Sequence, residues 1–579
     1  MPEYLAPGVF VEETSFRSKS IEGVSTSTAA FIGPTRRGPV GEVSELLTRF
    51  GDFERVYGGL NDLDYSGNGA PPKTNYLAHA VFHFFNEGGA RLYVSRVCAD
   101  ASGSAASADV IADNPDTKAA QFVARFKGSG GNGKVVLEEI AVASSRAAAA
   151  KAVDGSLMRA KGDAQANPVI AEAYFVKRNG AWQKTDGAAH DFDAAEESRG
   201  LELLTLTVTA VDADGNATVY EDLGYDPQHK RYVGAMLAEN PARRDDQLTQ
   251  WVALKLTGPV TPFDLRAAFA PAANQRTREV PLTGGTDAAP GSGDWTRALD
   301  LVEALDDVSI VAAPGASAYA DREAVALALI SHAEKRRAYR IAVLDTDQNL
   351  TPGGARQFKA KLDSKYAALY YPWVVAANPL ARPDRPEVPR EVKLPPSGFV
   401  CGIYARSDIE RGVFKAPANE VIRAALRFER LISTGEQEQL NPLGVNCLRF
   451  FPGRGHRVWG ARTTSSDPEW KYVNVRRYFN YLEHSIDRGT QWAVFEPNGE
   501  RLWANVRDTV ASFLFNEWVN GALLGDKPEQ AFFVRCDRST MTQNDLDNGR
   551  LICLIGVAVL KPAEFVIFRI GQKTADARG

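Results

Sequence analysis

The apolar pattern is most unusual near the end of the chain, in the segment 564–570. Its large apolar residues fall on both faces of an extended chain: Phe565 and Ile567 on one face, and Val566, Phe568 and Ile570 on the other. A strand that is apolar on both faces is typical of one covered on both sides by other protein. Only nine residues follow it, so we predict a terminal strand that must enter a sheet of its own or of a neighbouring chain.

A shorter strand is predicted at the other end of the chain. A β-prone run follows Pro7 and consists of Gly8, Val9, Phe10, Val11 and Glu12. The polar stretch 14–28 comes next and has little to bury, so we interpret it as a linker. The apolar run 29–33 is then predicted to be the first strand of the core. Both ends of the chain are therefore predicted to carry a short strand outside the main body.

The region between residues 100 and 280 differs from its surroundings. Before it, the apolar spacing predicts a helix over 74–86 and a strand over 91–97. Stretches of small residues at 99–108 and 283–293 are typical of domain boundaries. Between them the pattern predicts strands at 121–126, 134–140, 173–177 and 201–211. We therefore predict that 101–280 is a β-rich domain inserted into another domain.

After residue 280 the pattern alternates between helical and extended periods. Helices are predicted at 295–306, 322–337 and 354–365, and strands at 308–312, 340–344 and 367–376. This alternation predicts a doubly wound α/β sheet. Two long amphipathic helices, 470–488 and 505–524, precede two final strands, 550–560 and 564–570.

The predicted fold class is therefore α/β (α+β), with a discontinuous core, a β-rich inserted domain and an extended strand arm at each end. The chain is predicted to begin with an N-terminal arm and linker at 1–28 and to end with a C-terminal arm at 563–579. Between them, the core domain is predicted to consist of the segments 29–100 and 281–562, with the inserted domain 101–280 separating the two.

Composition and charge narrow the class of protein. With 579 residues, 44% hydrophobic and 24% charged, the chain has the composition of a multidomain soluble protein. A net charge of −5 gives no footprint for nucleic acid or for an anionic membrane. We expect no membrane insertion, because no run approaches the ~20 apolar residues of a membrane span. The five scattered cysteines form no CxxC pair, and the first residues show no signal peptide, so we expect synthesis in the bacterial cytoplasm with reduced thiols.

A glycine-rich stretch, Gly128 to Lys134, fits the first seven positions of a phosphate-binding P-loop. The eighth position, which should be Ser or Thr, is Val135. A helix should follow so that its N-terminus meets the phosphate, whereas this sequence predicts a strand. We therefore interpret the stretch as a connection, and we expect no nucleotide cofactor.

His79 and His83 have the i, i+4 spacing of a two-histidine metal site on the predicted helix 74–86. The metalloprotease pattern needs Glu after the first histidine, and Ala80 stands there instead. No third ligand is evident nearby, so we expect no metal and place both residues on the rim of the helix.

The remaining charged clusters are candidates for contacts. Ser, His and Asp are all present, but no GxSxG elbow supports a hydrolase, which remains the alternative function: an α/β hydrolase that does not polymerise. The Gly-rich loop 453–460 carries Arg454 and Arg457, which would suit an anion or a subunit contact. The faces of the two late helices that are predicted to be exposed offer further candidate contacts: Arg476, Arg477, Arg507 and Glu517.

Several stretches together resemble a known family. They are YLAPGVFVEE at 4–13, PLTGGTD at 281–287, PPSGFVCGIYAR at 395–406, RGVFKAPAN at 411–419, LNPLGVN at 440–446, VWGART at 458–463, and the segments 491–498 and 551–572. In these stretches the chain resembles the sheath proteins of contractile phage tails and of related extracellular contractile injection systems. The resemblance covers roughly 1–100 and 280–579 and is thin within 101–280.

The resemblance implies a structural subunit, not an enzyme, with no cofactor. Such subunits polymerise around an inner tube in an extended, metastable state and contract to drive the tube through a target envelope. The implied partners are neighbouring sheath subunits, the inner tube protein, and baseplate and tail-terminator proteins, with no nucleic acid. The implied location is a phage tail or a released contractile particle. In this family, terminal strands join the sheets of neighbouring subunits, which here implies arms at Gly8 to Glu12 and at Phe565 to Ile570.

Overall fold

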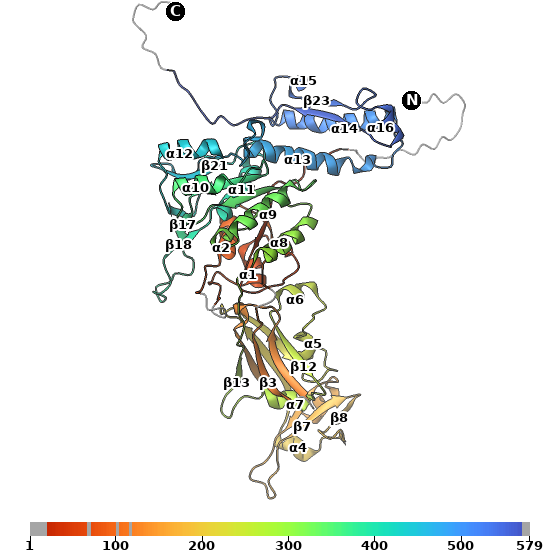
Figure 1. Ribbon diagram of the computed structural model, residues 1–579. Helices are drawn as coiled ribbons and strands as arrows, with labels where there is room; N and C mark the ends of the chain where they lie inside the picture. Colours follow the sequence, from red (N-terminus) through yellow and green to blue (C-terminus); the bar gives the residue numbers. More distant parts are fainter. Residues whose placement is uncertain (1–19, 66–70, 100–102, 115–117, 570–579) are drawn as a thin grey trace, which may run out of the picture.

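The computed structural model describes residues 20–65, 71–99, 103–114 and 118–569. The predicted N-terminal strand at Gly8 to Glu12 lies outside these residues, as does Ile570. Three layers follow one another along the long axis of the molecule in Figure 1. A helical layer with one β-hairpin lies at the top, an α/β body in the middle and a β-rich region at the bottom.

An eight-stranded sheet forms the centre of the body, in the order β19-β22-β21-β16-β15-β14-β1-β2. The strands from β21 to β2 run parallel, and β22 and β19 add an antiparallel edge. The bounds are β1 Thr28–Gly33, β2 Arg91–Arg96, β14 Ile310–Ala312, β15 Ile341–Asp345, β16 Ala367–Tyr371, β19 Glu420–Val421, β21 Val445–Phe451 and β22 Gly455–Val458. Every residue of β1 and of β15 is buried, as expected for parallel strands with both faces covered.

Helices cover both faces of this sheet. Alternation along β1 sends Ala29 and Phe31 into one apolar layer and Ala30 and Ile32 into the other. The first layer contains α1 Phe50–Tyr57, α2 Tyr76–Asn86 and α11 Ser397–Arg411; the second contains α8 Ser292–Leu301, α9 Arg322–Glu334 and α10 Pro352–Lys359. The predicted doubly wound alternation is therefore observed in the body. The predicted strand 367–376 is divided into β16 and β17 Val374–Ala377, with Pro372 between them.

A small sheet and one helix complete the body beside β21. The sheet has the order β18-β17-β20, with β18 Glu391–Leu394 and β20 Ala425–Phe428, and the helix is α12 Thr434–Leu440.

The strands between Ser107 and Pro281 form two further sheets, which lie below the body in Figure 1. One has the order β13-β5-β10-β6-β7-β8-β9 with β11 on β10, and the other has the order β12-β4-β3. The strand bounds are β3 Ser107–Asn114, β4 Lys118–Ala124, β5 Lys134–Ser144, β6 Leu157–Ala160, β7 Ala173–Arg178, β8 Ala181–Gln183, β9 Ala189–His190, β10 Leu201–Val211, β11 Ala217–Leu223, β12 Val252–Thr257 and β13 Thr277–Pro281. The helices are α3 Arg146–Lys151, α4 Ala194–Arg199, α5 Val233–Met236, α6 Arg244–Thr249 and α7 Pro262–Phe269.

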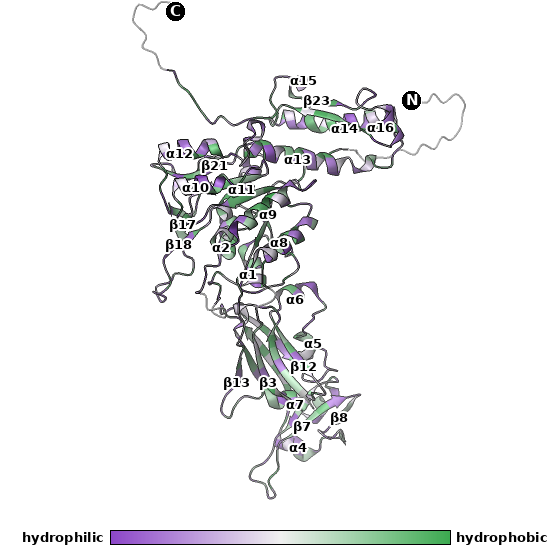
Figure 2. Cartoon of the chain, viewed as in Figure 1, coloured by the Kyte–Doolittle hydropathy of each residue, from purple (hydrophilic) through white to green (hydrophobic). Residues whose placement is uncertain are grey.

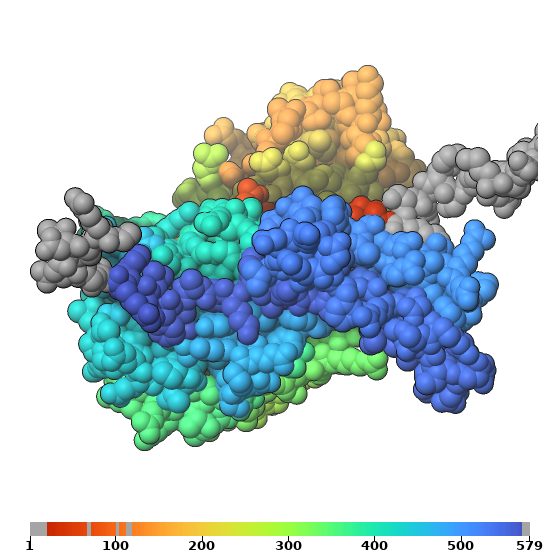
Figure 3. Space-filling view, turned by 90° about the horizontal axis from the view of Figure 1, so that it is seen from above, coloured from red at the N-terminus to blue at the C-terminus, as the bar shows by residue number. Residues whose placement is uncertain are grey.

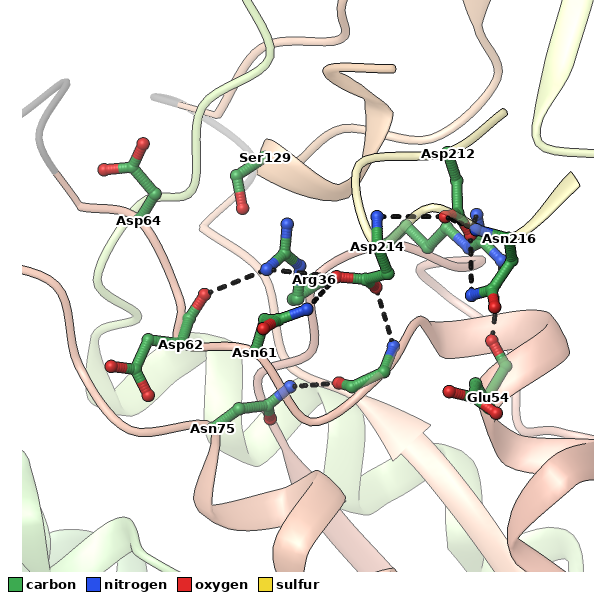
Figure 4. A network of polar contacts seen from close by, with 12 residues as sticks. Arg36, Glu54, Asn61, Asp62, Asp64, Asn75, Ser129, Asp212, Asp214 and Asn216 are labelled. Atoms are coloured by element: carbon green, nitrogen blue, oxygen red, sulfur yellow. Dashed lines mark hydrogen bonds and ion pairs between the residues drawn. The ribbon is translucent and has the colours of Figure 1, made fainter. Parts of the chain in front are cut away.

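Buried ion pairs fasten this β-rich region to the body (Figure 4). The loop between β10 and β11 carries Asp212, which pairs with Arg37 at 2.7 Å, and Asp214, which pairs with Arg36 at 3.3 Å. Asp214 also accepts hydrogen bonds from the Gly59 amide, at 2.9 Å, and from the side chain of Asn61, at 2.6 Å. Because these groups are almost fully buried, each depends on its partner across the junction.

The top layer contains α13 Val473–Gly489, α14 Glu500–Val519, α15 Pro528–Ala531 and α16 Gln543–Asp547, with the hairpin β23 Phe532–Arg535 and β24 Leu554–Val557. The two predicted late helices are thus present, and α14 begins earlier than predicted, at Glu500. The predicted strand 550–560 is shorter in the structure, where Leu554–Val557 forms the strand and Val559 adds one bridge to Leu523.

Candidate subunit-interface site

The C-terminal segment leaves the body as an exposed apolar chain. After β24, residues 558–569 run without regular secondary structure and cross the face seen in Figure 3 towards the edge where the described chain ends. Phe565, Val566, Ile567 and Phe568 are 71%, 68%, 78% and 81% exposed, and the segment appears as a hydrophobic trace in Figure 2. Residues 564–569 therefore form no strand within the subunit, because the described residues offer this segment no sheet; its addition to a neighbouring subunit stays a prediction.

Glu564 fixes the root of this segment. Its carboxylate accepts hydrogen bonds from Arg462 Nε at 2.8 Å and Nη2 at 2.6 Å, from Asn441 at 2.7 Å and from the Tyr472 hydroxyl at 3.0 Å. Burial by itself raises the pKa of Glu564, but the hydrogen bonds from Arg462 and Asn441 outweigh it and lower the pKa to about 2. The apolar residues 565–568 therefore begin at a fixed, charged anchor.

The N-terminal side has a comparable root. The Val24 amide donates to Ser485 at 3.1 Å, and Ile21 packs against Gly489 at the end of α13. Thr26 donates to Asp408 at 2.6 Å, and Arg477 donates to the same carboxylate, at 2.9 Å to Oδ1, and to the Thr26 carbonyl at 3.0 Å. Both members of the Arg477–Asp408 pair are 3% exposed.

One helix connects the two roots. The N-terminal root is attached along α13 at Arg477, Ser485 and Gly489. The C-terminal root is attached at the start of the same helix, where Tyr472 binds Glu564 and Asn474 donates to the Leu560 carbonyl at 3.2 Å. The described chain therefore begins and ends on opposite sides of the top layer (Figure 1).

The hairpin β23–β24 is an open sheet beside these roots. Among the described strands its two strands pair only with each other, and beyond β24 Val559 bridges Leu523, so the open edges are those of Phe532–Arg535 and Leu554–Val557. Phe533, Leu554 and Ile555 on this hairpin are 52%, 51% and 37% exposed. A two-stranded sheet is only marginally stable alone, and an edge with exposed apolar side chains accepts further strands.

The charged residues predicted as contacts divide into two groups. Arg454 is exposed, and Arg457 and Arg507 are half-buried. Arg454 and Arg457 donate to Asn419 and Arg507 pairs with Asp508, and a contact role for these three stays a prediction. The expectation that Arg476 and Arg477 lie on an exposed face is wrong, because they are 1% and 3% exposed. Arg476 lies over the rings of Tyr366 and Trp470 and pairs with Glu483, and Arg477 pairs with Asp408. Glu517 faces inward and accepts hydrogen bonds from Tyr478 and Tyr481.

The sequence patterns that suggested chemistry have structural explanations. The stretch from Gly128 is a short turn, Ser129–Gly131, followed by strand β5, so the predicted strand stands where a P-loop would have a helix.

The expectation that His79 and His83 lie on the rim of the helix is wrong, because both are buried. Burial lowers their pKa values to about 4 and about 3, and the ring of His83 stacks on Phe399. Across the described ranges no cluster of three His, Cys, Asp or Glu side chains is arranged to hold a metal.

No described helix combines the length and the apolar character that crossing a membrane requires.

Two family models match adjoining stretches of the chain. The phage tail sheath protein central domain matches residues 288–464, and the phage tail sheath C-terminal domain matches residues 465–573. The chain belongs to the phage tail sheath family. The C-terminal model includes α13, the hairpin and the anchored apolar segment, so these features lie within the shared domain.

Curated relatives carry the same description. The sheath protein is 28% identical over 265 residues to a putative prophage major tail sheath protein of Pseudomonas aeruginosa (strain UCBPP-PA14). The aligned region covers 45% of this chain and 64% of the relative. It is 23% identical over 194 residues to the tail sheath protein of Enterobacteria phage T4, and the aligned region covers 32% of this chain and 28% of that protein. The match thus spans less than two thirds of each of these relatives.

Solved structures extend the comparison to the whole chain. The helical sheath of the anti-feeding prophage in the contracted state matches with a TM-score of 0.53 and 20% identity, covering 98% of this chain and 99% of that one. A sheath complex of an extracellular contractile injection system in the contracted state is 34% identical over 47% of this chain and 73% of that chain, with a TM-score of 0.41. The first match shows a shared fold. The sheath protein is therefore a structural component of a contractile phage tail or phage-like injection system, not an enzyme, and the hydrolase alternative is not favoured.

Proposed function

We propose that this sheath protein is the repeating subunit of a sheath that polymerises around an inner tube in an extended, metastable state and contracts to drive the tube through a target envelope. The observation that carries this proposal is the segment Phe565 to Phe568, whose four apolar side chains are 68–81% exposed beyond a fixed anchor. In a monomer these apolar side chains stay in contact with water, which is unfavourable, whereas a polymer can bury them between subunits.

In the proposed assembly the C-terminal arm enters the sheet of a neighbouring subunit. The free edges of the hairpin β23–β24 supply the backbone donors and acceptors for an added strand. Each net hydrogen bond contributes ~1 kcal/mol, and burial of each large apolar side chain contributes up to about 1.5–3 kcal/mol. The N-terminal residues Gly8 to Glu12 are proposed as the second arm.

Anchored roots suit a sheath that changes shape. A strand joint keeps its hydrogen bonds while whole subunits rotate as rigid bodies, and the charged roots at Glu564 and Asp408 hold each arm to its own subunit. The energy of contraction is then a difference in packing between two lattices, summed over many subunits, and needs no cofactor.

The proposed partners are neighbouring copies of this chain, the inner tube protein, and baseplate and tail-terminator proteins. The full-length match to the helical sheath of the anti-feeding prophage supports assembly with copies of the same chain. We propose synthesis in the bacterial cytoplasm followed by incorporation into a phage tail or a released particle. We also propose that 101–280 is an inserted domain, supported by its separate sheets and its own apolar cluster, and that 1–28, 29–100, 281–562 and 563–579 are the other units.

Truncation after Glu564 tests the arm proposal, because it removes the apolar segment and leaves the anchor intact. We expect a folded, soluble subunit by circular dichroism that forms no tubes in negative-stain micrographs. Val169→Asp is the matched control, since it removes an apolar side chain that is 67% exposed in the β-rich region. Long tubes formed by the truncated protein at wild-type yield would refute the arm proposal.

A further inference from the structure

The loop between α13 and α14 presents a phenylalanine that the subunit does not use. Phe495 is 102% exposed, and the neighbouring Val494 is 58% exposed. Single exposed apolar residues are common, but a fully exposed aromatic ring at the tip of a turn is the best-placed anchor for a partner.

The backbone at Phe495 is also strained. Its φ is +68°, in the left-handed region that bulky residues rarely adopt. Val494 has φ −71° and ψ 130°, and the Glu496 amide donates to the Ala493 carbonyl at 3.3 Å, so residues 493–496 form a type II turn. Such a turn favours Gly at the position that Phe495 occupies. Strain of this kind is typical of functional sites.

Hydrogen bonds fix the chain on both sides of the turn. The Ala493 amide donates to the Thr490 carbonyl at 2.9 Å on one side. On the other side Asn498 accepts from Trp503 Nε1 at 2.7 Å and donates to the Arg550 carbonyl at 3.2 Å. The backbone that carries the ring is therefore fixed on both sides, which lowers the entropic cost of docking it.

An apolar groove of about 970 Å³ lies at the other end of α13. Its walls include Phe414, Trp459, Tyr472, Leu560 and Pro562, all half-buried, so their rings and methyl groups remain partly open. The Glu564 anchor holds residues 560–564 as one wall. The C-terminal root thus forms one side of the groove, and Phe565 and Val566 of the exposed segment also line it.

The exposed ring and the groove cannot meet within one subunit. Tyr472 of the groove directly precedes α13, and the loop with Phe495 follows its end, so a rigid helix of 17 residues, about 26 Å long, separates them. A projection at one end and a recess at the other make a head-to-tail contact between copies, which continues along a ring or helix instead of closing on a pair.

Charge complements this geometry. Glu496 is exposed beside Phe495, and Lys561 is exposed at the mouth of the groove. Neither side chain has an ion-pair partner among the described residues, so the two charges are available to each other between copies. Such pairs at the rim of an interface fix its register more than its strength.

We propose that Phe495 of one subunit inserts into the groove between Trp459, Tyr472 and Leu560 of a second copy, with Glu496 facing Lys561 there. This contact rests on the proposed function, because it joins subunits of the same polymer. It differs from the strand arms in the inserted residue, since Phe495 lies outside residues 565–568 and outside the hairpin, whereas Phe565 and Val566 of the acceptor line part of the groove.

The first test replaces Phe495 by glycine. F495G removes the ring and relieves the turn, so we expect a thermal midpoint equal to or above that of the wild type and at least a tenfold loss of tubes counted by negative-stain microscopy. L327N, which removes another half-exposed apolar side chain on α9, should assemble normally. Wild-type tube yield from F495G would overturn the proposal.

Cross-linking identifies the acceptor. A variant with E496C and K561C, treated with a short bismaleimide after assembly, should give a ladder of dimers, trimers and longer chains. Each single-cysteine variant should give no ladder above the background of native Cys553. Absence of a ladder from assembled tubes would overturn the assignment of the groove. Failure of the wild-type protein to form any tubes would instead refute the proposed function itself.

Discussion

The anchor at Glu564 allows one prediction to be developed in detail. Substitution by glutamine (E564Q) keeps the size of the side chain and removes its charge, so the ion pair with Arg462 at 2.6 Å is lost. The pKa of Glu564 is lowered from 4.5 to about 2, which corresponds to at most roughly 3 kcal/mol of anchoring free energy. The carboxylate is partly exposed, and solvent screening reduces this to roughly 1–2 kcal/mol.

This loss should appear as local opening of the root. A change of 1–2 kcal/mol raises the population of the open state by roughly 5–30-fold. We expect limited proteolysis within residues 558–569 of the monomer to accelerate by up to that factor, with little change in the rest of the protein. The same opening should occur in the wild type at low pH. Because the folded-state pKa is lowered, the stabilisation is complete above about pH 4.5 and is lost as the pH falls towards about 2.

The matched control is E438Q, which alters an exposed glutamate on the wall of the same groove. It should leave the cleavage rate in 558–569 unchanged. Equal cleavage rates for E564Q and the wild type in that segment would show that Glu564 is not an anchor.

The other predictions concern buried polar groups in the body. R37M leaves Asp212 buried without its partner and should lower the free energy of unfolding by about 3–5 kcal/mol in denaturant titrations, with E45Q at the surface as control. For the same reason, an excision of 109–279 should fold well only when Arg36 and Arg37 are also replaced by uncharged residues; equal stability with both arginines retained would contradict this. H83F should change the free energy of unfolding by less than about 1 kcal/mol, since neither ring nitrogen of His83 has a hydrogen-bond partner, and a large loss would reveal a hidden one.

The alternating elements of the body follow from local pattern. The run 341–345 is continuously apolar up to its final Asp345, which predicts a strand covered on both faces. Every residue of that strand is buried in the structure, as predicted. Helix α11 escapes prediction, because eleven of its fifteen residues are buried and no amphipathic stripe marks it. The prediction for Arg476 and Arg477 fails because charged residues are expected to face solvent. In the structure Arg476 is buried against an aromatic ring, and Arg477 is buried in an ion pair with Asp408.

The anchors of the two arms cannot be derived from the pattern. Glu564 is separated from Arg462 by 102 residues, and Thr26 from Asp408 by 382 residues. Such contacts depend on the folded path of the chain, and no local spacing encodes them. What the sequence does indicate is an apolar terminal segment without a place of its own, and the exposure of residues 565–568 agrees with that expectation.

The attachment of both roots to α13 has a mechanical consequence. When neighbouring subunits pull on the two arms, tension enters at Tyr472 and Asn474 on one side and at Arg477, Ser485 and Gly489 on the other. The load path therefore runs along a single helix, whose hydrogen bonds lie parallel to the pull. The N-terminal tether also loads the body, because Thr26 binds Asp408 of α11 and stands two residues before β1, so the central sheet resists the pull together with α13.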